Sequence, residues 1–178
     1  MKSLLIIASL LGHVSLFAQN NLYDYDVEQR LDDLGIELID LKLPPGINIE
    51  PAVRSGNLVY LSGNGPITSD GKRIAGKVGK DLTIEQGYDA ARLTAIRHLS
   101  VLKKEIGDLN RVVKIVKVLG LVNAPPDFTE HPKVINGYTD LMIEVFGQRG
   151  KHARSAMGMG SLPWNLACEI EVIVEVKE

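Results

Sequence analysis

The last apolar segment of the chain, residues 168–176, alternates between two kinds of side chain. Its even positions are small or apolar, and three of its odd positions are the glutamates Glu169, Glu171 and Glu175. Successive side chains of a β-strand point to opposite faces of a sheet, so one face of this strand must be covered while the other tolerates charge. The segment therefore predicts a sheet with helices on one side only.

Two segments with helical periodicity can supply that cover. Residues 84–106 carry apolar side chains at spacings of three or four, behind a capping box formed by Thr83 and Gln86, and Gly107 ends the pattern. Residues 134–145 repeat the same spacing. Both segments predict amphipathic helices whose apolar sides pack on the sheet.

Five strands are expected around these helices. Gly56 and Asn57 form a turn signal between two short apolar runs, which predicts a β-hairpin. The strands are expected at 52–54, 58–62, 112–122, 152–159 and 167–176. This order predicts an α+β fold with two helices on one face of a mixed sheet. Nothing else in the chain can cover the second face, so we expect an oligomer.

The N-terminus has the pattern of a signal peptide. Lys2 precedes the apolar run 4–11, the apolar character continues to Phe17, and Ala18 stands before the expected cut. A buried N-terminal helix or strand is the alternative. The run is too short to span a membrane comfortably, and no later segment is suited to one. We therefore expect a signal peptide at 1–18, an exported protein that is periplasmic or secreted, and no membrane span after cleavage.

The remainder divides into an extension and one domain. Apolar residues at positions 27, 31 and 34 predict a short helix, ended by Gly35, within an extension that spans residues 19–50. Residues 51–178 form the expected domain. A hydrophobic content of 45% suits a single core of this size.

Charge and cysteine content exclude several classes of protein. The formal net charge is −2 and no basic cluster is present, whereas non-specific nucleic-acid binding needs a basic face. We therefore expect no nucleic-acid partner. The single cysteine, Cys168, cannot form an intrachain disulfide. Its place in the apolar set of the last strand predicts a buried small side chain rather than a reactive thiol.

Arg154 is the most informative polar residue. It is a lone cation on a predicted strand, where a guanidinium is costly unless an anion meets it. If Met157 and Met159 face the helices, alternation places Arg154 on the other face, together with Glu169. Three interpretations remain open. Arg154 forms an ion pair with a glutamate of another subunit, is exposed to solvent through a shifted register, or binds a small carboxylate with its five fixed donors.

Other polar motifs are weaker. Residues 62–66 form a glycine-rich turn, but it lacks the lysine of a phosphate-binding loop. His98, His131 and His152 do not have the spacing of metal ligands, and we expect neither a metal nor an organic cofactor. For His152 we expect a structural role, with orientation of a group near Arg154 as the alternative.

Several short motifs together resemble the RidA (YjgF-type) superfamily, once labelled endoribonuclease L-PSP. The resemblance covers residues 50–178, and the stretch 150–156 is similar to an uncharacterised branch of that superfamily. The matching motifs are Gly56-Asn57-Leu58-Val59-Tyr60-Leu61-Ser62-Gly63, Asn136-Gly137 at the expected start of a helix, Ala153-Arg154-Ser155, Leu162-Pro163 and Glu169-Ile170-Glu171.

This resemblance implies a chorismate-mutase-like α+β fold and a homotrimer with three sites in the clefts between subunits. It also implies hydrolysis of enamines and imines of 2-amino acids to 2-keto acids and ammonia. Arg154 matches the arginine that binds the substrate carboxylate, and Glu169 matches the glutamate that places the attacking water. Ser62 and Asn136 match residues that line the site, and Gly63 adjoins Ser62.

Two positions depart from the deaminase pattern. Ala156 stands where the family has a cysteine, and a small residue near Ala52 replaces the tyrosine of the first strand. In the family both normally touch the substrate. The arginine and the glutamate of the pattern are retained as Arg154 and Glu169. From the resemblance we expect a RidA-like protein that binds a small imino or keto acid and hydrolyses imines. The alternative is a non-catalytic trimer of the same fold that binds a ligand or a partner.

Overall fold

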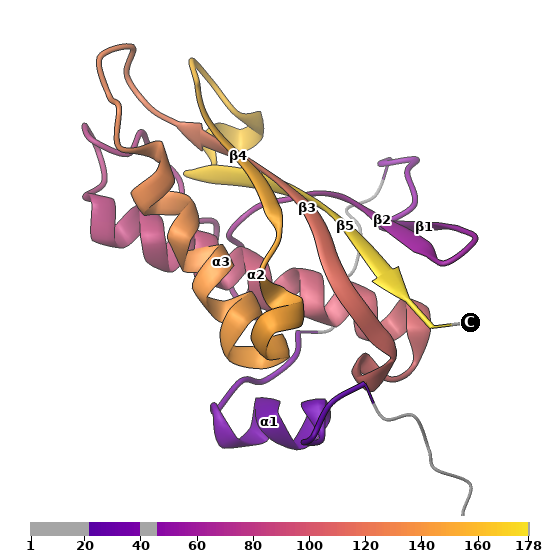
Figure 1. Ribbon diagram of the computed structural model, residues 1–178. Helices are drawn as coiled ribbons and strands as arrows, with labels where there is room; N and C mark the ends of the chain where they lie inside the picture. Colours follow the sequence, from indigo (N-terminus) through magenta and orange to yellow (C-terminus); the bar gives the residue numbers. More distant parts are fainter. Residues whose placement is uncertain (1–21, 40–45, 178) are drawn as a thin grey trace, which may run out of the picture.

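The computed structural model describes residues 22–39 and 46–177, which form a five-stranded sheet with two long helices against one face (Figure 1). The strands are β1 (Ala52–Ser55), β2 (Leu58–Asn64), β3 (Val112–Asn123), β4 (Ala153–Met159) and β5 (Cys168–Val176). The helices are α1 (Val27–Asp33), α2 (Ile84–Ile106) and α3 (His131–Phe146). Helices α2 and α3 cover the sheet, which confirms the predicted α+β architecture.

The strand order across the sheet is β1-β2-β5-β3-β4. β3 and β4 run parallel, with α3 as the connection between them, and all other neighbours are antiparallel. The sheet is therefore mixed, as predicted, and the five expected strands form with ends shifted by at most two residues. The long β3 and β5 occupy central positions, whereas β4 lies at an edge.

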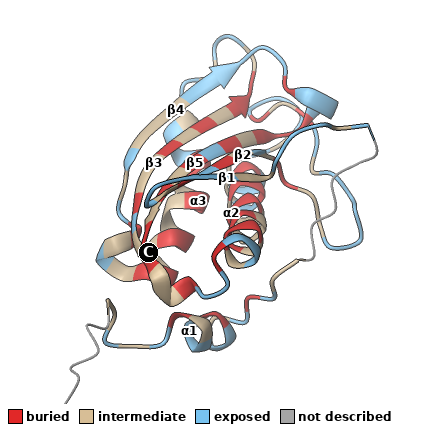
Figure 2. Cartoon of the chain, turned by 90° about the vertical axis from the view of Figure 1, so that its right-hand side faces the viewer, coloured by how far each residue is buried: buried red, intermediate tan, exposed pale blue. Residues whose placement is uncertain are grey.

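The alternation in β5 corresponds to its two environments (Figure 2). Its apolar side chains are at most 2% exposed and face the helices: Cys168, Ile170, Val172, Val174 and Val176. Complete burial of one aliphatic side chain contributes roughly 1.5–3 kcal/mol, so this strand is a large part of the core. The glutamates lie on the face away from the helices, as expected.

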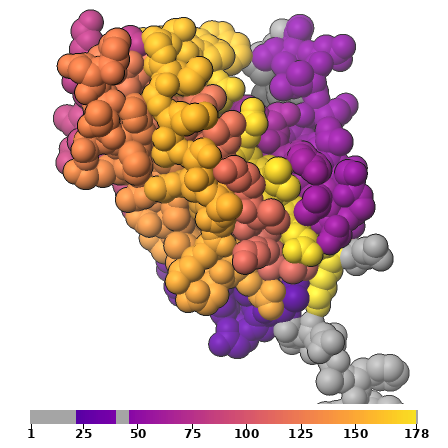
Figure 3. Space-filling model, turned by 45° about the horizontal axis from the view of Figure 1, so that its top comes forward, coloured from indigo at the N-terminus to yellow at the C-terminus, as the bar shows by residue number. Residues whose placement is uncertain are grey.

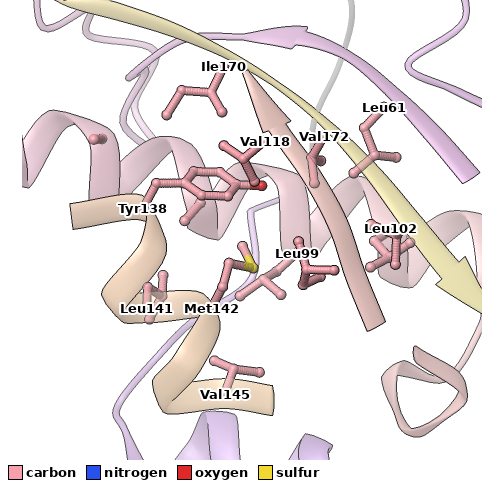
Figure 4. Packing of buried hydrophobic residues seen from close by; sticks show 14 of the residues in the cluster. Leu61, Leu99, Leu102, Val118, Tyr138, Leu141, Met142, Val145, Ile170 and Val172 are labelled. Carbon is pink, nitrogen blue, oxygen red and sulfur yellow. The ribbon is translucent and has the colours of Figure 1, made fainter. Parts of the chain in front are cut away.

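The core fills the space between the sheet and the helices. Figure 4 shows Leu99 and Leu102 of α2 and Leu141 of α3 gathered beneath side chains of the sheet. The two helices approach closely at Gly137, where a β-carbon would lie 2.0 Å from the carbonyl oxygen of Tyr88. Only glycine permits this approach, so Gly137 sets the distance between the two helices.

Helix α3 begins earlier than its motif indicated. The expected start at Asn136 and Gly137 is wrong, since the helix begins at His131 with Glu130 as its N-cap. Pro132 suits the first turn because its missing N–H would have no intrahelical partner there. Asn136 therefore lies in the second turn of the helix, beneath β4 rather than in a loop.

The extension packs on the domain. The predicted short helix forms as α1, with Val27 and Leu31 buried in the common core. The Glu28 carboxylate accepts hydrogen bonds from the Lys103 ammonium at 2.7 Å and from the backbone N–H of Leu109 at 2.8 Å. The predicted signal peptide, residues 1–18, lies outside the described residues. Among the described helices, none is both long and apolar enough to cross a membrane.

Candidate functional site

The guanidinium of Arg154 is held by two polar side chains of α3. Its Nη1 donates to Asn136 Oδ1 and to Thr139 Oγ1, both at 2.9 Å. Partial burial lowers the pKa of Arg154, while the charge of Asp140 opposes that shift. Within residues 22–39 and 46–177, no carboxylate forms an ion pair with Arg154. A positioned cation of this kind has donors left for a small anion.

The predicted orientation of β4 is wrong. Its even positions face α3: Arg154 bonds to that helix, and a β-carbon at Gly158 would meet the ring of His131. Met157 and Met159 point away and are 47% and 37% exposed. The covered space beside α3 is filled by polar and ring side chains of the helix, so the small members of β4 fit there and the methionines do not.

The strand register gives the same result. Arg154 pairs with Val118, which pairs with Val172, and both valines are buried under the helices. Glu169 pairs instead with Leu121, and both lie on the open side of the sheet, which is the face away from the helices. Arg154 and Glu169 therefore lie on opposite faces of the sheet within one copy of the chain, and the expected shared face is contradicted.

Glu169 is a half-buried carboxylate beside the end of β2. Burial raises its pKa, and the charge of Glu171 adds to the rise. No hydrogen bond or ion pair to its carboxylate is found among the described residues. A β-carbon at Gly63 would lie 2.5 Å from Glu169 Oε1, so a larger residue there would displace this carboxylate from its position. An unpaired carboxyl group with a raised pKa is suited to proton transfer.

Ser62 and Gly63 lie on β2 next to Glu169. All three line a hollow of about 580 Å³ on the open side of the sheet, together with Lys117 and Tyr60. The Ser62 hydroxyl donates to the carbonyl oxygen of Glu50 at 2.7 Å, which holds the segment before β1 against β2. The structure thus brings Ser62, Gly63 and Glu169 together.

His98 and Tyr138 support this part of the site from inside the core. His98 Nε2 lies 3.2 Å from the carbonyl oxygen of Ser62, which can only accept, so Nε2 carries the proton. Nδ1 then accepts from the Tyr138 hydroxyl at 3.0 Å. Burial lowers the pKa of His98 to about 4, which keeps the ring neutral. Sequence reasoning missed this role, although His98 lies within the apolar stripe of α2.

A second chain of hydrogen bonds supports Arg154. His152 Nδ1 donates to the carbonyl oxygen of Gly150 at 2.7 Å, so its Nε2 is free to accept from the Thr139 hydroxyl at 3.2 Å. Thr139 in turn accepts from Arg154. Burial lowers the pKa of His152 and favours this neutral form. Sequence reasoning missed Thr139, which its spacing of three from Asn136 on a helix could have indicated.

Cys168 takes no part in either group. It is fully buried, 3.7 Å from Thr94 Oγ1, and burial raises the pKa of its thiol to about 12. The predicted role as a small buried side chain is confirmed. In the described part of the chain, no three His, Cys, Asp or Glu side chains are grouped closely enough to hold a metal ion.

Comparison with known proteins identifies the family. Residues 28–176 match the model of the family described as "YjgF/chorismate mutase-like, putative endoribonuclease". The chain belongs to this family. It is 38% identical to Protein TCP17 of Trypanosoma cruzi over 146 residues, which cover 79% of this chain and 91% of that protein.

Two solved structures share the fold of this chain. Atu1372 of Agrobacterium tumefaciens, of unknown function, is 39% identical with a TM-score of 0.76, over 85% of this chain and 94% of that chain. A "putative endoribonuclease" of Shewanella oneidensis MR-1 is 32% identical with a TM-score of 0.81, over 85% of this chain and all of that one. These similarities confirm the chorismate-mutase-like fold without assigning an activity.

The residues expected from the resemblance to this family fall into two groups. Arg154 and Asn136 form one group between β4 and α3. Ser62, Gly63 and Glu169 form the other at the end of β2. A single copy of the chain does not bring the two groups together.

Proposed function

We propose that this YjgF-family protein is a homotrimer that binds small 2-imino and 2-keto carboxylates between its subunits and hydrolyses the imines. The observation that carries the proposal is the guanidinium of Arg154, fixed by Asn136 and Thr139 without a carboxylate partner among the described residues. Such a group matches a carboxylate in bidentate geometry.

Assembly is part of this proposal because Arg154 and Glu169 face opposite sides of one sheet. A site that uses both must take Arg154 from one copy and Glu169 from the next. β4 lies at an edge of the sheet, where its side chains are within reach of a neighbouring subunit. A closed ring of three copies then repeats one heterologous contact three times.

The side chains on the open face of the sheet favour coverage of this face by a second copy of the chain. Figure 3 looks onto this side, where β4, β3, β5 and the β1–β2 hairpin lie side by side. Exposed apolar side chains on these strands are Val53, Tyr60, Met157 and Met159. Apolar side chains gathered on one sheet face are characteristic of an interface between proteins.

The proposed reaction converts an imine and one water into a ketone and ammonia. Arg154 binds the carboxylate of the substrate. Glu169 of the adjacent subunit takes a proton from a water molecule as the oxygen of that water bonds to the imine carbon. Glu169 returns that proton to the nitrogen, which gives a carbon bearing both a hydroxyl and an amino group. Glu169 then takes the hydroxyl proton and passes it to the nitrogen as the carbon–nitrogen bond breaks, so ammonia leaves and the carbonyl forms. The raised pKa of Glu169 suits a group that both accepts and returns this proton.

A non-catalytic ligand-binding trimer is the second candidate. Ala156 replaces the cysteine of the deaminase pattern and packs against the core without a polar group. Ala52 at the start of β1 also lacks the hydroxyl of the tyrosine expected there. Both features leave the carboxylate anchor intact and reduce the number of polar groups available for catalysis.

Hydrolysis of 2-iminopropanoate generated in situ separates these candidates. Purified protein should release ammonia and pyruvate faster than the uncatalysed reaction, and Glu169→Gln should remove the acceleration. Calorimetry with pyruvate tests binding, with Arg154→Ala as its control. Binding without hydrolysis would favour the non-catalytic trimer. Absence of both would favour Arg154 as an ion pair between subunits. Light scattering tests the trimer directly.

Export is a separate proposal. It rests on Lys2 and the apolar run 4–11, which have the order of a signal peptide. Terminal sequencing of protein recovered from the producing cell tests it. A mature chain that begins at Gln19 would support cleavage after Ala18, whereas an intact Met1 would contradict it.

A further inference from the structure

A second hollow, of about 270 Å³, also adjoins Glu169. Glu169 and Gly63 line both hollows, so the two meet at the candidate catalytic carboxylate. The wall of the smaller hollow is mainly apolar, and its apolar members include Ile47, Ile49, Ile67, Trp164 and Leu166. An apolar space beside a reacting centre is suited to the non-reacting part of a substrate.

Trp164 is the most distinctive residue of this wall. It lies in the 3₁₀ turn Pro163–Asn165 between β4 and β5, and 54% of it is exposed. Trp164 and Asn165 have φ values of 53° and 56° and are the non-glycine residues with positive φ in the described part of the chain. A bulky residue in this backbone region is strained, and such strain is retained chiefly at functional sites.

Specific contacts hold the strained turn in place. The Asn165 side chain accepts from Asn123 Nδ2 at 2.9 Å, and its carbonyl oxygen accepts from the backbone N–H of Gly76 at 2.8 Å. The Lys77 ammonium donates to Asn123 Oδ1 at 3.0 Å and to the carbonyl oxygen of Gly160. The turn that carries Trp164 is thus held by groups on two other segments, β3 and residues 76–77, while the ring remains partly open to solvent.

The two arginines of this wall have partners of their own. Arg97 donates from Nε to Asn64 Oδ1 at 2.9 Å and from Nη1 to the carbonyl oxygen of Ile67 at 3.1 Å. The guanidinium carbon of Arg73 lies 5.0 Å from the centre of the Trp164 ring. Stacked there, Arg73 supports the ring. The surface left for a ligand is therefore mainly that of the ring and the aliphatic side chains.

We propose that this hollow receives the side chain of the bound imino or keto acid and selects bulky apolar side chains over a methyl group. The inference rests on the proposed function, because the carboxylate and the reacting carbon must lie between Arg154 and Glu169. The volume is sufficient, since an apolar cavity of about 150 Å³ holds a benzene molecule. The substrate class is then that of leucine and phenylalanine rather than alanine or serine.

Calorimetry with pyruvate and 4-methyl-2-oxopentanoate tests this selection. The wild-type protein should bind the branched acid at least about tenfold more tightly, as expected for added methyl groups in an apolar pocket. Trp164→Gly should abolish that preference, so that the two acids bind the variant with similar affinity. Glycine suits the positive φ at this position, so the variant should fold at least as well as the wild type. Trp164→Phe retains a ring and should retain most of the preference.

Trp164 is the single tryptophan of the chain, so its fluorescence reports on this hollow alone. The branched acid should change the emission more than pyruvate does. Binding of pyruvate without preference for the branched acid would overturn the inference and leave the proposed function standing, as would a preference that survives in Trp164→Gly. Absence of binding by both acids would overturn the proposed function and the inference with it.

Discussion

Arg154 and Glu169 lie on opposite faces of one sheet. Arg154 is directed at α3, where Asn136 and Thr139 accept its hydrogen bonds, whereas Glu169 is on the side away from both helices. One copy of the chain cannot direct both groups at the same small molecule. In the proposed function, ligand binding therefore depends on subunit assembly.

Thr139→Val should weaken carboxylate binding without unfolding the protein. The valine has a similar shape but cannot accept from Arg154 or donate to His152. A hydrogen bond to a charged group contributes about 1.5–3 kcal/mol, so the dissociation constant for pyruvate should rise roughly tenfold or more. Calorimetry measures this change. Thr139→Ser keeps the hydroxyl and should bind like the wild type; equal weakening in both variants would contradict the role of the hydroxyl.

Glu171→Gln should lower the pKa of Glu169. Burial is the main cause of the raised pKa, and the negative charge of Glu171 is the second. Because Glu169 must be ionised to accept a proton, the acidic limb of the profile of kcat/KM against pH should move to lower pH in this variant. It should stay above the position of an ordinary glutamate, since burial remains. An unchanged or upward-shifted limb would contradict Glu169 as the titrating base.

His98 should make stability depend on pH. Its folded pKa of about 4 lies below the ordinary value of 6.5, because burial opposes the charge. The unfolded chain therefore binds the proton more readily. The free energy of unfolding is therefore not reduced by His98 above pH 6.5. It falls as the pH decreases towards 4, by on the order of 3 kcal/mol in total.

Urea unfolding between pH 4 and 7, at one protein concentration, measures this loss. His98→Gln can still donate to the carbonyl oxygen of Ser62 and accept from Tyr138, but it does not titrate. Its stability should fall less over the same interval. Equal slopes for the variant and the wild type would show that His98 is not the responsible group.

Gly137→Ala should destabilise the fold. The added methyl group would meet the carbonyl oxygen of Tyr88 at 2.0 Å, where α2 and α3 cross. Overpacking of this kind costs about 1–3 kcal/mol or more, despite the better helix propensity of alanine. Gly160→Ala is the control, because no atom lies within 4 Å of its added methyl group. Thermal unfolding of both variants measures the difference, and equal midpoints would contradict the close approach.

The elements of this fold were predictable because burial imposes simple periods on them. The alternation around Ile170 and Val172 follows from one covered sheet face, and the capping box at Thr83 marks where α2 begins. Helix α3 was placed correctly except for its start, since the amphipathic pattern becomes visible only from Val134. The first turn carries Pro132, whose effect on a helix depends on its position in it.

The orientation of β4 was not predictable from its own residues. Both of its faces carry small or apolar side chains, with Ala156 and Gly158 on one and Met157 and Met159 on the other. Polarity alone cannot choose between them. The choice depends on α3, whose polar side chains accept from Arg154 and leave room only for small neighbours. This information is distributed over two segments that meet only in the folded chain.

Two supporting residues were also beyond sequence reasoning. Trp164 acquires its significance from a positive φ that neither its residue type nor its neighbours would suggest. His98 looks like one of several scattered histidines, and only its contacts with Tyr138 and the Ser62 carbonyl oxygen connect it with the site. In both cases tertiary contacts give the residue its role.

The central claim is that each site takes Arg154 from one subunit and Glu169 from another. Arg154→Ala and Glu169→Gln should each be inactive towards 2-iminopropanoate when pure. Mixed trimers can be made by unfolding and refolding equal amounts of the two variants together. In such trimers some sites receive the intact arginine from one copy and the intact glutamate from its neighbour.

The hydrolysis rate of these mixed trimers is the most direct measurement. Random assembly of equal amounts should restore about one quarter of the wild-type sites, and thus about one quarter of the wild-type rate. Each variant refolded alone should remain inactive, which controls for the refolding step. A mixture that assembles into trimers but stays as inactive as its two components, beside an active wild type, would contradict a site shared between subunits.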